Sequence, residues 1–204
     1  MQKEYTRWTF EREKCALLVV DMQNDFVLDG AIMQVKEAKN QLPKIQRLIA
    51  TCRELSVPII YTVHTTEPKY CPLEIAAFPH LKNAGMREGT DGVKVVDDLQ
   101  PQAGDIVLKK RRFSAFYQTD LEVILRNIKT PAVDTIIICG TVTNICCEST
   151  ARDAFFRDYK VVFGSDICSA INKAAHEATL KNMEIFGRTM NCEAIIKSLE
   201  NGKG

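Results

Sequence analysis

The feature that most constrains the fold of this chain is an alternation between short apolar runs and longer segments of helical period. The short, β-prone runs cover 16–20, 58–63, 105–108, 135–139 and 160–163. The segments with apolar residues three and four positions apart cover 43–55, 119–127, 144–158 and 172–186. Strands that alternate with amphipathic helices build βαβ units, in which helices cover both faces of a parallel sheet. The alternation therefore predicts an α/β fold with three layers.

The chain length and the absence of boundaries favour a single domain over 1–204. A length of 204 residues suits one compact core. No internal repeat, low-complexity tract or linker divides the sequence. The segment 67–104 interrupts the alternation with prolines and glycines, so we expect an irregular excursion of the kind that closes over active sites. A terminal helix is predicted over 192–199.

Charge and hydropathy favour a small-molecule partner. With 27 basic and 26 acidic residues the net charge is +1, which offers no field for nucleic acid or for an anionic membrane. The basic run 109–112 has no stacking aromatics around it and is expected to be solvated. The first residues are charged, and no run approaches the roughly 20 apolar residues of a membrane helix. We therefore expect a cytoplasmic protein.

The cysteines and the known phosphate motifs argue against a cofactor. The chain has eight cysteines, and several lie in apolar, strand-like runs, where a reduced thiol acts as a small hydrophobe. No CxxC pair or Cys/His cluster has the spacing of a structural zinc site. The GxGxxG and P-loop patterns are also absent. We expect free thiols, no metal and no cofactor.

Reactive side chains follow three of the predicted strands. Asp21 comes directly after one strand, the adjacent Lys109 and Lys110 end another, and Cys146 follows a third. Ligands of open parallel sheets bind beyond the carboxyl ends of the strands, so these groups are expected to converge. A helix that begins near Asn144 would place Cys146 in its first turn, where free amides and a nearby cation lower the pKa of a thiol. The aspartate would then be a base, and the lysine would stabilise charge.

The same regions resemble a known family. Three segments resemble, in order and spacing, the signature blocks of the isochorismatase-like cysteine hydrolases: LLVVDMQNDFV, GDIVLKKRRFSAFYQTDLEVILR and IIICGTVTNICCESTARDAFFRDYKVV. The likeness runs from Cys15 to about Ala170. It implies a doubly wound, mostly parallel sheet and a catalytic triad of Asp21, Lys110 and Cys146. The family lysine stands three residues before an aromatic-Ser-Ala-Phe block, which selects Lys110 over its neighbour.

The resemblance also implies backbone donors and a type of substrate. The amides of Thr143 and Cys146 would stabilise the oxyanion. Nicotinamidases of this superfamily bind a metal through an Asp-Trp-His block, whereas this chain has Thr62 in place of the aspartate and no second histidine before His80, so a metal-dependent nicotinamidase is disfavoured. The block TNICCESTARDA looks most like ureidoacrylate and biuret amidohydrolases. We therefore predict C–N cleavage of a small amide, ureide or carbamoyl compound through a cysteine acyl-enzyme.

Several alternatives stay open. A vinyl ether hydrolase of the isochorismatase type and a non-catalytic module that binds a nucleotide or a partner protein are the competing functions. Candidate substrate-binding residues are Phe26, His64 and Phe113, although aromatic residues at such spacings are as often core and His64 is equally suited to a structural role. Asp25 is equally suited to capping a loop and to forming a hydrogen bond with the substrate.

The remaining expectations concern neighbouring residues and assembly. Cys147 is expected to pack in the core, because a residue adjacent to the nucleophile on a helix points about 100° away from it. His80 and His176 are expected at the surface or in loops. By resemblance, the protein is expected to form a homo-oligomer, either a dimer or a tetramer.

Overall fold

The computed structural model describes residues 8–204, which form a six-stranded, all-parallel sheet in the order β3-β2-β1-β4-β5-β6. The strands are β1 (Cys15–Val20), β2 (Ile59–His64), β3 (Ile106–Lys110), β4 (Thr135–Thr141), β5 (Lys160–Ser169) and β6 (Arg188–Met190). The order runs outward in one direction from β1 to β3 and in the other from β4 to β6. This reversal between β1 and β4 is the switch point of a doubly wound fold, and it confirms the predicted fold class.

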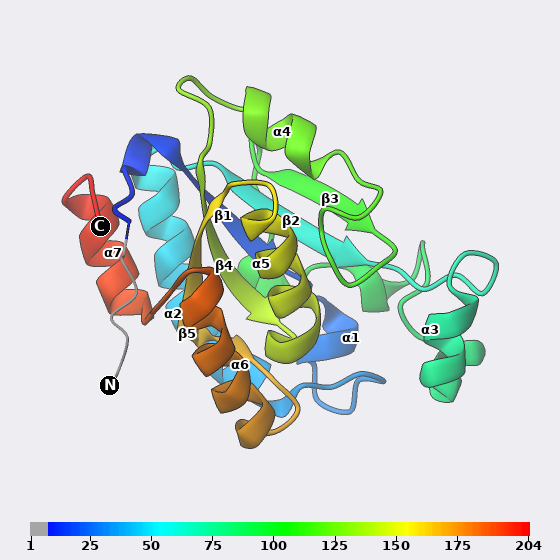
Figure 1. Ribbon diagram of the computed structural model, residues 1–204. Helices are drawn as coiled ribbons and strands as arrows, with labels where there is room; N and C mark the ends of the chain where they lie inside the picture. Colours follow the sequence, from blue (N-terminus) through cyan, green and yellow to red (C-terminus); the bar gives the residue numbers. More distant parts are fainter. Residues whose placement is uncertain (1–7) are drawn as a thin grey trace.

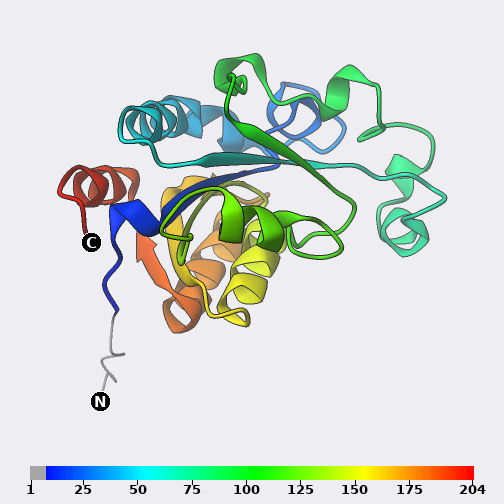
Figure 2. The ribbon, with the colours of Figure 1, turned by 90° about the horizontal axis from the view of Figure 1, so that it is seen from above.

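Helices cover both faces of the sheet (Figures 1 and 2). The helices of more than one turn are α2 (Lys36–Glu54), α3 (Pro72–Ala77), α4 (Leu121–Asn127), α5 (Glu148–Phe155), α6 (Lys173–Phe186) and α7 (Cys192–Glu200). The short ones are α1 (Asn24–Val27), the 3-10 turns η1 (Arg12–Lys14), η2 (Pro79–Lys82), η3 (Asp91–Val93) and η4 (Asp97–Leu99), and the π-turn η5 (Thr143–Cys147). Figure 2 shows α2 on one side of the sheet and α4, α5 and α6 on the other. The molecule therefore has three layers.

Each face of the sheet has its own apolar core. Leu17 and Val19 of β1 pack into one core with residues of α2 and α7, whereas Leu18 and Val20 pack into a second core with residues of α4, α5 and α6. All six residues of β1 are buried. A strand that is buried on both faces reads as a continuous apolar run rather than as an alternating one, which is why β1 was recognisable in the sequence.

The main differences from the predictions concern the start of α2, the segment after β4 and the last strand. Helix α2 begins at Lys36 rather than at Pro43, and Pro43 lies on its exposed side, where water can replace the hydrogen bond that proline does not donate. The predicted helix over 144–158 is divided into η5 and α5. Strand β6 was not predicted, because its three residues are half-buried and too few to produce a pattern.

The excursion 67–104 is anchored beside the carboxyl ends of β1 and β2. The side-chain amide of Gln23 donates to the Val93 carbonyl at 3.1 Å, and the Asp25 carboxylate accepts from the Met86 amide at 2.6 Å. Asp25 therefore holds a loop, which was one of its two predicted roles. The excursion carries α3, which projects beyond the sheet at the right of Figure 1. Among the described residues, no helix combines the length and apolarity needed to cross a bilayer.

Candidate active site

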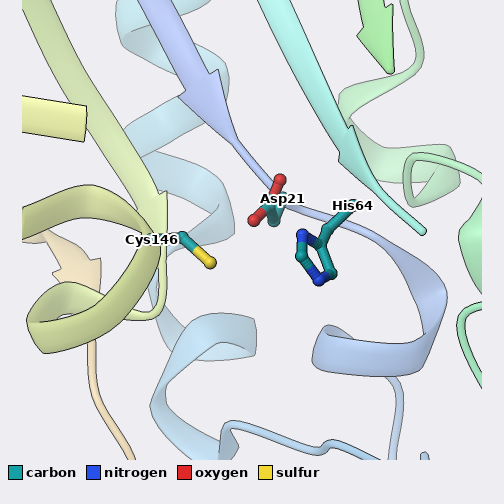
Figure 3. Close-up of side chains that lie close together, drawn as sticks. All are labelled: Asp21, His64 and Cys146. Atoms are coloured by element: carbon teal, nitrogen blue, oxygen red, sulfur yellow. The ribbon is translucent and has the colours of Figure 1, made fainter. Parts of the chain in front are cut away.

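Four side chains from four strand ends meet at the switch point. Asp21 directly follows β1, His64 ends β2, Lys110 ends β3, and Cys146 lies in η5 after β4. Asp21, His64 and Cys146 each place one polar atom within 4.8 Å of the others. Figure 3 shows the Cys146 sulfur pointing toward the space between Asp21 and His64. The structure thus brings together the three residues proposed from the sequence as a triad, together with His64.

Asp21 and Lys110 form a fully buried ion pair. The Lys110 ammonium lies 2.7 Å from Asp21 Oδ2, and neither side chain has exposed surface. Asp21 Oδ1 accepts a hydrogen bond of 2.6 Å from the Thr62 hydroxyl, which fixes the carboxylate plane. Burial acts to lower the pKa of Lys110, but the neighbouring Asp21 carboxylate acts in the opposite direction, and the net pKa is raised above its ordinary value. Lys110 is therefore charged at neutral pH.

The strand pattern selects Lys110 rather than Lys109. Side chains alternate along β3, so Leu108 and Lys110 are buried while Lys109 is exposed. Lys109 and Arg111 both pair with Glu88 at the surface. Of the basic run 109–112, Lys110 therefore lies in the site, whereas Lys109 and Arg111 form solvated ion pairs at the surface.

Cys146 is held in a π-turn and is a protonated thiol at rest. The Cys147 amide donates to the Val142 carbonyl at 3.2 Å, five residues earlier, which is the π pattern often found at functional sites. Cys146 is 3% exposed. Burial raises the pKa of its thiol well above the ordinary value, against the lowering effect of Lys110. Lys110 thus lowers the thiol pKa as expected, but the expected net lowering is wrong for this closed form, because desolvation dominates.

His64 connects the ammonium to a carboxylate that the sequence did not reveal. The Lys110 ammonium lies 3.0 Å from His64 Nδ1. An ammonium has no lone pair, so Nδ1 accepts and the ring proton is on Nε2. Nε2 donates to Glu74 Oε1 at 2.5 Å. His64 is 1% exposed, and both of its ring nitrogens have partners. Glu74 lies on α3, and nothing in the sequence of the excursion indicates that it faces His64.

His64, Glu74 and Cys146 line a small and largely apolar cavity of about 20 Å³. That volume is about the space of one water molecule. The predicted substrate-binding residues Phe26, His64 and Phe113 all line it, together with Cys146. Phe113 stacks on His64 with ring centroids 6.1 Å apart. Substrate entry therefore requires movement of the lining, part of which is Glu74 of α3.

The donors available here do not fit a metal ion. Asp21, His64 and Cys146 are the group of potential ligands found in residues 8–204. The position between them is taken by the Lys110 ammonium, which contacts both Asp21 and His64 Nδ1. Thr62, at the position where a nicotinamidase metal block has aspartate, is committed to Asp21. The site therefore satisfies its negative charge with an ammonium.

The other cysteines are not part of the site. All eight cysteines are free, as predicted, and all are buried. Cys147 has no exposed surface and packs in the second core, and burial followed by the neighbouring Cys168 raises the pKa of its thiol. Its placement agrees with the predicted packing role. Cys146 packs in the same core but also lines the cavity, which Cys147 does not.

Thr143 begins η5 and is fully buried. Its hydroxyl lies 3.0 Å from Nδ1 of His176, which belongs to α6. His176 is therefore a partly exposed helical residue with a specific partner rather than a loop residue, and helical spacing alone does not tell which neighbour such a side chain meets. His80, in contrast, is exposed.

The sequence agrees with this geometry when it is compared with known proteins. The Isochorismatase domain family matches residues 15–194. The chain belongs to the isochorismatase family. This range contains all the strands and every residue of the site described above.

Its relatives are amide hydrolases. The chain is 32% identical over 188 residues to Nicotinamidase 3 of Arabidopsis thaliana, covering 90% of this chain and 88% of the relative. It is 32% identical over 201 residues to ureidoacrylate amidohydrolase of Yersinia enterocolitica, covering 87% and 85%. A crystal structure of a cysteine hydrolase from Pseudomonas syringae pv. phaseolicola superposes with a TM-score of 0.92 at 30% identity, covering 99% of this chain and 100% of that one. This isochorismatase-family protein is a cysteine-dependent amide hydrolase.

Proposed function

We propose that the amide cleaved by this protein is a ureide or carbamoyl compound, with Cys146 as the nucleophile and with Asp21 and Lys110 as its partners. The observation that carries the catalytic assignment is that one oxygen of the Asp21 carboxylate has no hydrogen-bond donor in the part of the chain that the structure describes. Its Oδ2 lies 2.7 Å from the Lys110 ammonium but accepts no well-aligned hydrogen bond within residues 8–204. A lone pair is therefore available for the thiol proton.

The proposed reaction begins when Asp21 takes the proton of the Cys146 thiol. The sulfur then forms a bond to the substrate carbonyl carbon, and the amides of Thr143 and Cys146 donate to the developing oxyanion. Lys110 stabilises the charge that passes between sulfur and carboxylate. Asp21 returns the proton to the leaving nitrogen as the C–N bond breaks, which leaves a thioester-like acyl enzyme.

Water completes the cycle through the same carboxylate. Asp21 takes a proton from a water molecule as its oxygen attacks the acyl carbon, and the proton then passes to sulfur as the C–S bond breaks. For a ureide, the products are ammonia and a carbamate. The small, largely apolar cavity of this closed form keeps bulk water away from the resting thiol.

The carboxylate of Glu74, in an otherwise largely apolar lining, supports a ureide over an amide with fewer N–H donors. Glu74 lines the cavity and has one carboxylate oxygen held by His64. A carboxylate accepts hydrogen bonds and donates none when ionised. A ureido or carbamoyl group carries several N–H donors for such an acceptor, whereas a substrate without them gains no hydrogen bond there, a difference of about 0.5–1.5 kcal/mol for each bond.

The assay that tests the proposal measures ammonia and pyruvate from biuret, a ureidoacrylate-type ureide, nicotinamide and isochorismate. We expect the largest kcat/KM for a ureide. Cys146→Ala should abolish turnover, and Cys147→Ala should retain most of it. Equal losses in the two variants would overturn the assignment of the nucleophile, and pyruvate from isochorismate without ammonia from any amide would overturn the reaction type.

A second comparison tests the role of Glu74. Glu74→Ala should lower kcat/KM for the ureide by about tenfold or more, because a loss of about 1.4 kcal/mol corresponds to a factor of ten, while the nicotinamide rate changes little. Loss of both rates to the same extent would contradict selection of the ureide by Glu74.

We also propose that residues 1–204 form a single cytoplasmic domain that assembles as a homo-oligomer.

A further inference from the structure

Helix α6 contacts the nucleophile turn on both sides of Cys146. On one side, His176 Nδ1 lies 3.0 Å from the hydroxyl of Thr143, three residues before the cysteine. On the other side, the Thr179 hydroxyl donates to Glu148 Oε2 at 2.8 Å, two residues after it. His176 and Thr179 are three residues apart, so they lie on the same face of α6. The helix thus holds η5 and the start of α5 at two points.

The direction of the first hydrogen bond is determined by its surroundings. His176 Nε2 lies 3.0 Å from the carbonyl oxygen of Ser165. A carbonyl oxygen only accepts, so Nε2 carries the proton and Nδ1 has the lone pair. The Thr143 hydroxyl therefore donates to Nδ1. The imidazole joins two segments, the middle of β5 and the start of η5, through opposite roles of its two nitrogens.

The second contact belongs to a wider set of bonds. Glu148 Oε1 accepts from Nε of Arg152 at 3.0 Å and from its Nη2 at 2.7 Å. The Arg152 guanidinium in turn lies over the ring of Phe186, 4.3 Å from its centroid. Because Glu148 is already oriented by Arg152 within α5, the bond from Thr179 transmits the position of α6 to the residues that follow the nucleophile.

We infer that His176 and Thr179 are positioning residues, which hold η5 so that the Cys146 sulfur and the amides of Thr143 and Cys146 stay directed at the reacting carbonyl. The inference rests on the proposed role of Cys146. Neither residue lines the cavity around the thiol. His176 instead borders a separate cleft of about 650 Å³ between α2 and the start of α6, which none of Asp21, Lys110 and Cys146 lines.

A displacement of about 1 Å in a reacting group costs roughly 100-fold in rate. The π-turn is sensitive to such displacement because it departs from the regular α-helical hydrogen-bond pattern and is not secured by a long helix of its own. Loss of the His176 bond should therefore lower kcat while leaving KM nearly unchanged, since the walls of the cavity remain in place.

The test is a double-mutant cycle on the Thr143–His176 bond, with the ureide that is turned over fastest as substrate. His176→Phe and Thr143→Val each remove one partner, and each should lower kcat about 10- to 100-fold with KM within about threefold. The double variant should lose no more than either single variant, because both remove the same bond. Multiplicative losses in the double variant would overturn the inference.

Conservative variants separate positioning from general destabilisation. His176→Asn retains an acceptor near the place of Nδ1 and should recover much of kcat, whereas His176→Gln, with its amide near the place of Nε2, should recover little. Equal recovery by both variants would contradict the bond to Thr143. Thr179→Val should lower kcat in the same way, while Lys181→Ala, on the exposed side of α6, should leave it unchanged. An unchanged kcat in Thr179→Val would remove the second contact from the inference.

The two levels of proposal fail in different ways. If Cys146→Ala is active, the proposed nucleophile is wrong and the inference about α6 loses its basis. If Cys146→Ala is inactive while His176→Phe retains full kcat, only the positioning role is wrong. Thermal melts of each variant establish whether it is folded at the assay temperature. A loss of kcat with unchanged KM in a folded variant then supports the positioning role.

Discussion

At the scale of single residues, the site depends on one buried ammonium. Lys110 neutralises Asp21, occupies the lone pair of His64 Nδ1 and donates to the carbonyl of Arg112 at 3.1 Å. Two of its three N–H donors thus have hydrogen-bond acceptors, and the charge itself is paired with Asp21. A buried charge is tolerated only when it is paired and hydrogen-bonded in this way. The same residue therefore supports both the folded state and the chemistry.

Replacing this ammonium should cost stability and activity together. Lys110→Met leaves the Asp21 carboxylate buried without its partner, which should lower the free energy of unfolding by about 3–5 kcal/mol and abolish measurable turnover. Lys109→Met is the matched control, because Lys109 pairs with Glu88 at the surface, and it should cost less than about 1 kcal/mol. Urea unfolding and ammonia release measure both effects. Similar stability in the two variants would contradict the importance of the buried pair.

At the scale of elements, two helices begin with the same cap but differ in what they contact. Asn172 caps α6 by accepting from the Ala175 amide at 2.8 Å, and Asn191 caps α7 by accepting from the Ala194 amide at 2.8 Å. Helix α6 contacts η5, whereas α7 packs against α2 and β5 on the other face of the sheet. Substitution of each cap in turn therefore separates the effect of helix stability from the effect of catalytic positioning.

We expect Asn172→Ala and Asn191→Ala to lower the free energy of unfolding by a similar amount, about 1 kcal/mol each. Only Asn172→Ala should also lower kcat, because it loosens the first turn of the helix that carries His176. Denaturant melts give the first quantity and steady-state kinetics the second. A fall in kcat with Asn191→Ala as large as with Asn172→Ala would show that activity follows overall stability and not the position of α6.

At the scale of the whole molecule, the two apolar cores contain thiols that resist ionisation. Burial raises the pKa of six of them: Cys15 to about 12, Cys192 to about 11, and Cys52, Cys139, Cys146 and Cys147 also upward. In the unfolded chain these groups ionise near pH 8.5. Between that pH and the folded pKa values, the unfolded state binds fewer protons than the folded state, so stability falls as pH rises.

The protein should therefore have its full thiol contribution to stability below about pH 8.5 and lose it at higher pH. Each thiol contributes up to about 1.4 kcal/mol per pH unit in this range, so urea melts in excess reductant should show a fall of several kcal/mol between pH 7.5 and 9.5. Cys192→Ala should make the dependence of the unfolding free energy on pH less steep, by the contribution of one thiol. A flat profile over this interval would mean that the buried thiols ionise without unfolding.

The strand cores and the triad candidates were predictable because they depend on local pattern and on one general property of parallel sheets. Runs such as 16–20 are apolar throughout because both faces are buried, and reactive residues directly after strands share one edge of the sheet. Alternation along a strand also predicted that only one of Lys109 and Lys110 faces the site, and the resemblance to the family block selected Lys110. These inferences need no knowledge of how distant segments pack.

Tertiary structure alone decided the rest. Glu74 meets His64 because α3 folds back over the strand ends, and His176 meets Thr143 because α6 packs on η5. No spacing in the chain encodes either distance. The protonation of Cys146 was wrongly predicted for the same reason: a nearby cation was inferable from strand order, but the exclusion of water around the sulfur arises only when the excursion and the π-turn close the cavity. Sequence thus determined which groups meet at the sheet edge, and packing determined their partners and their charge.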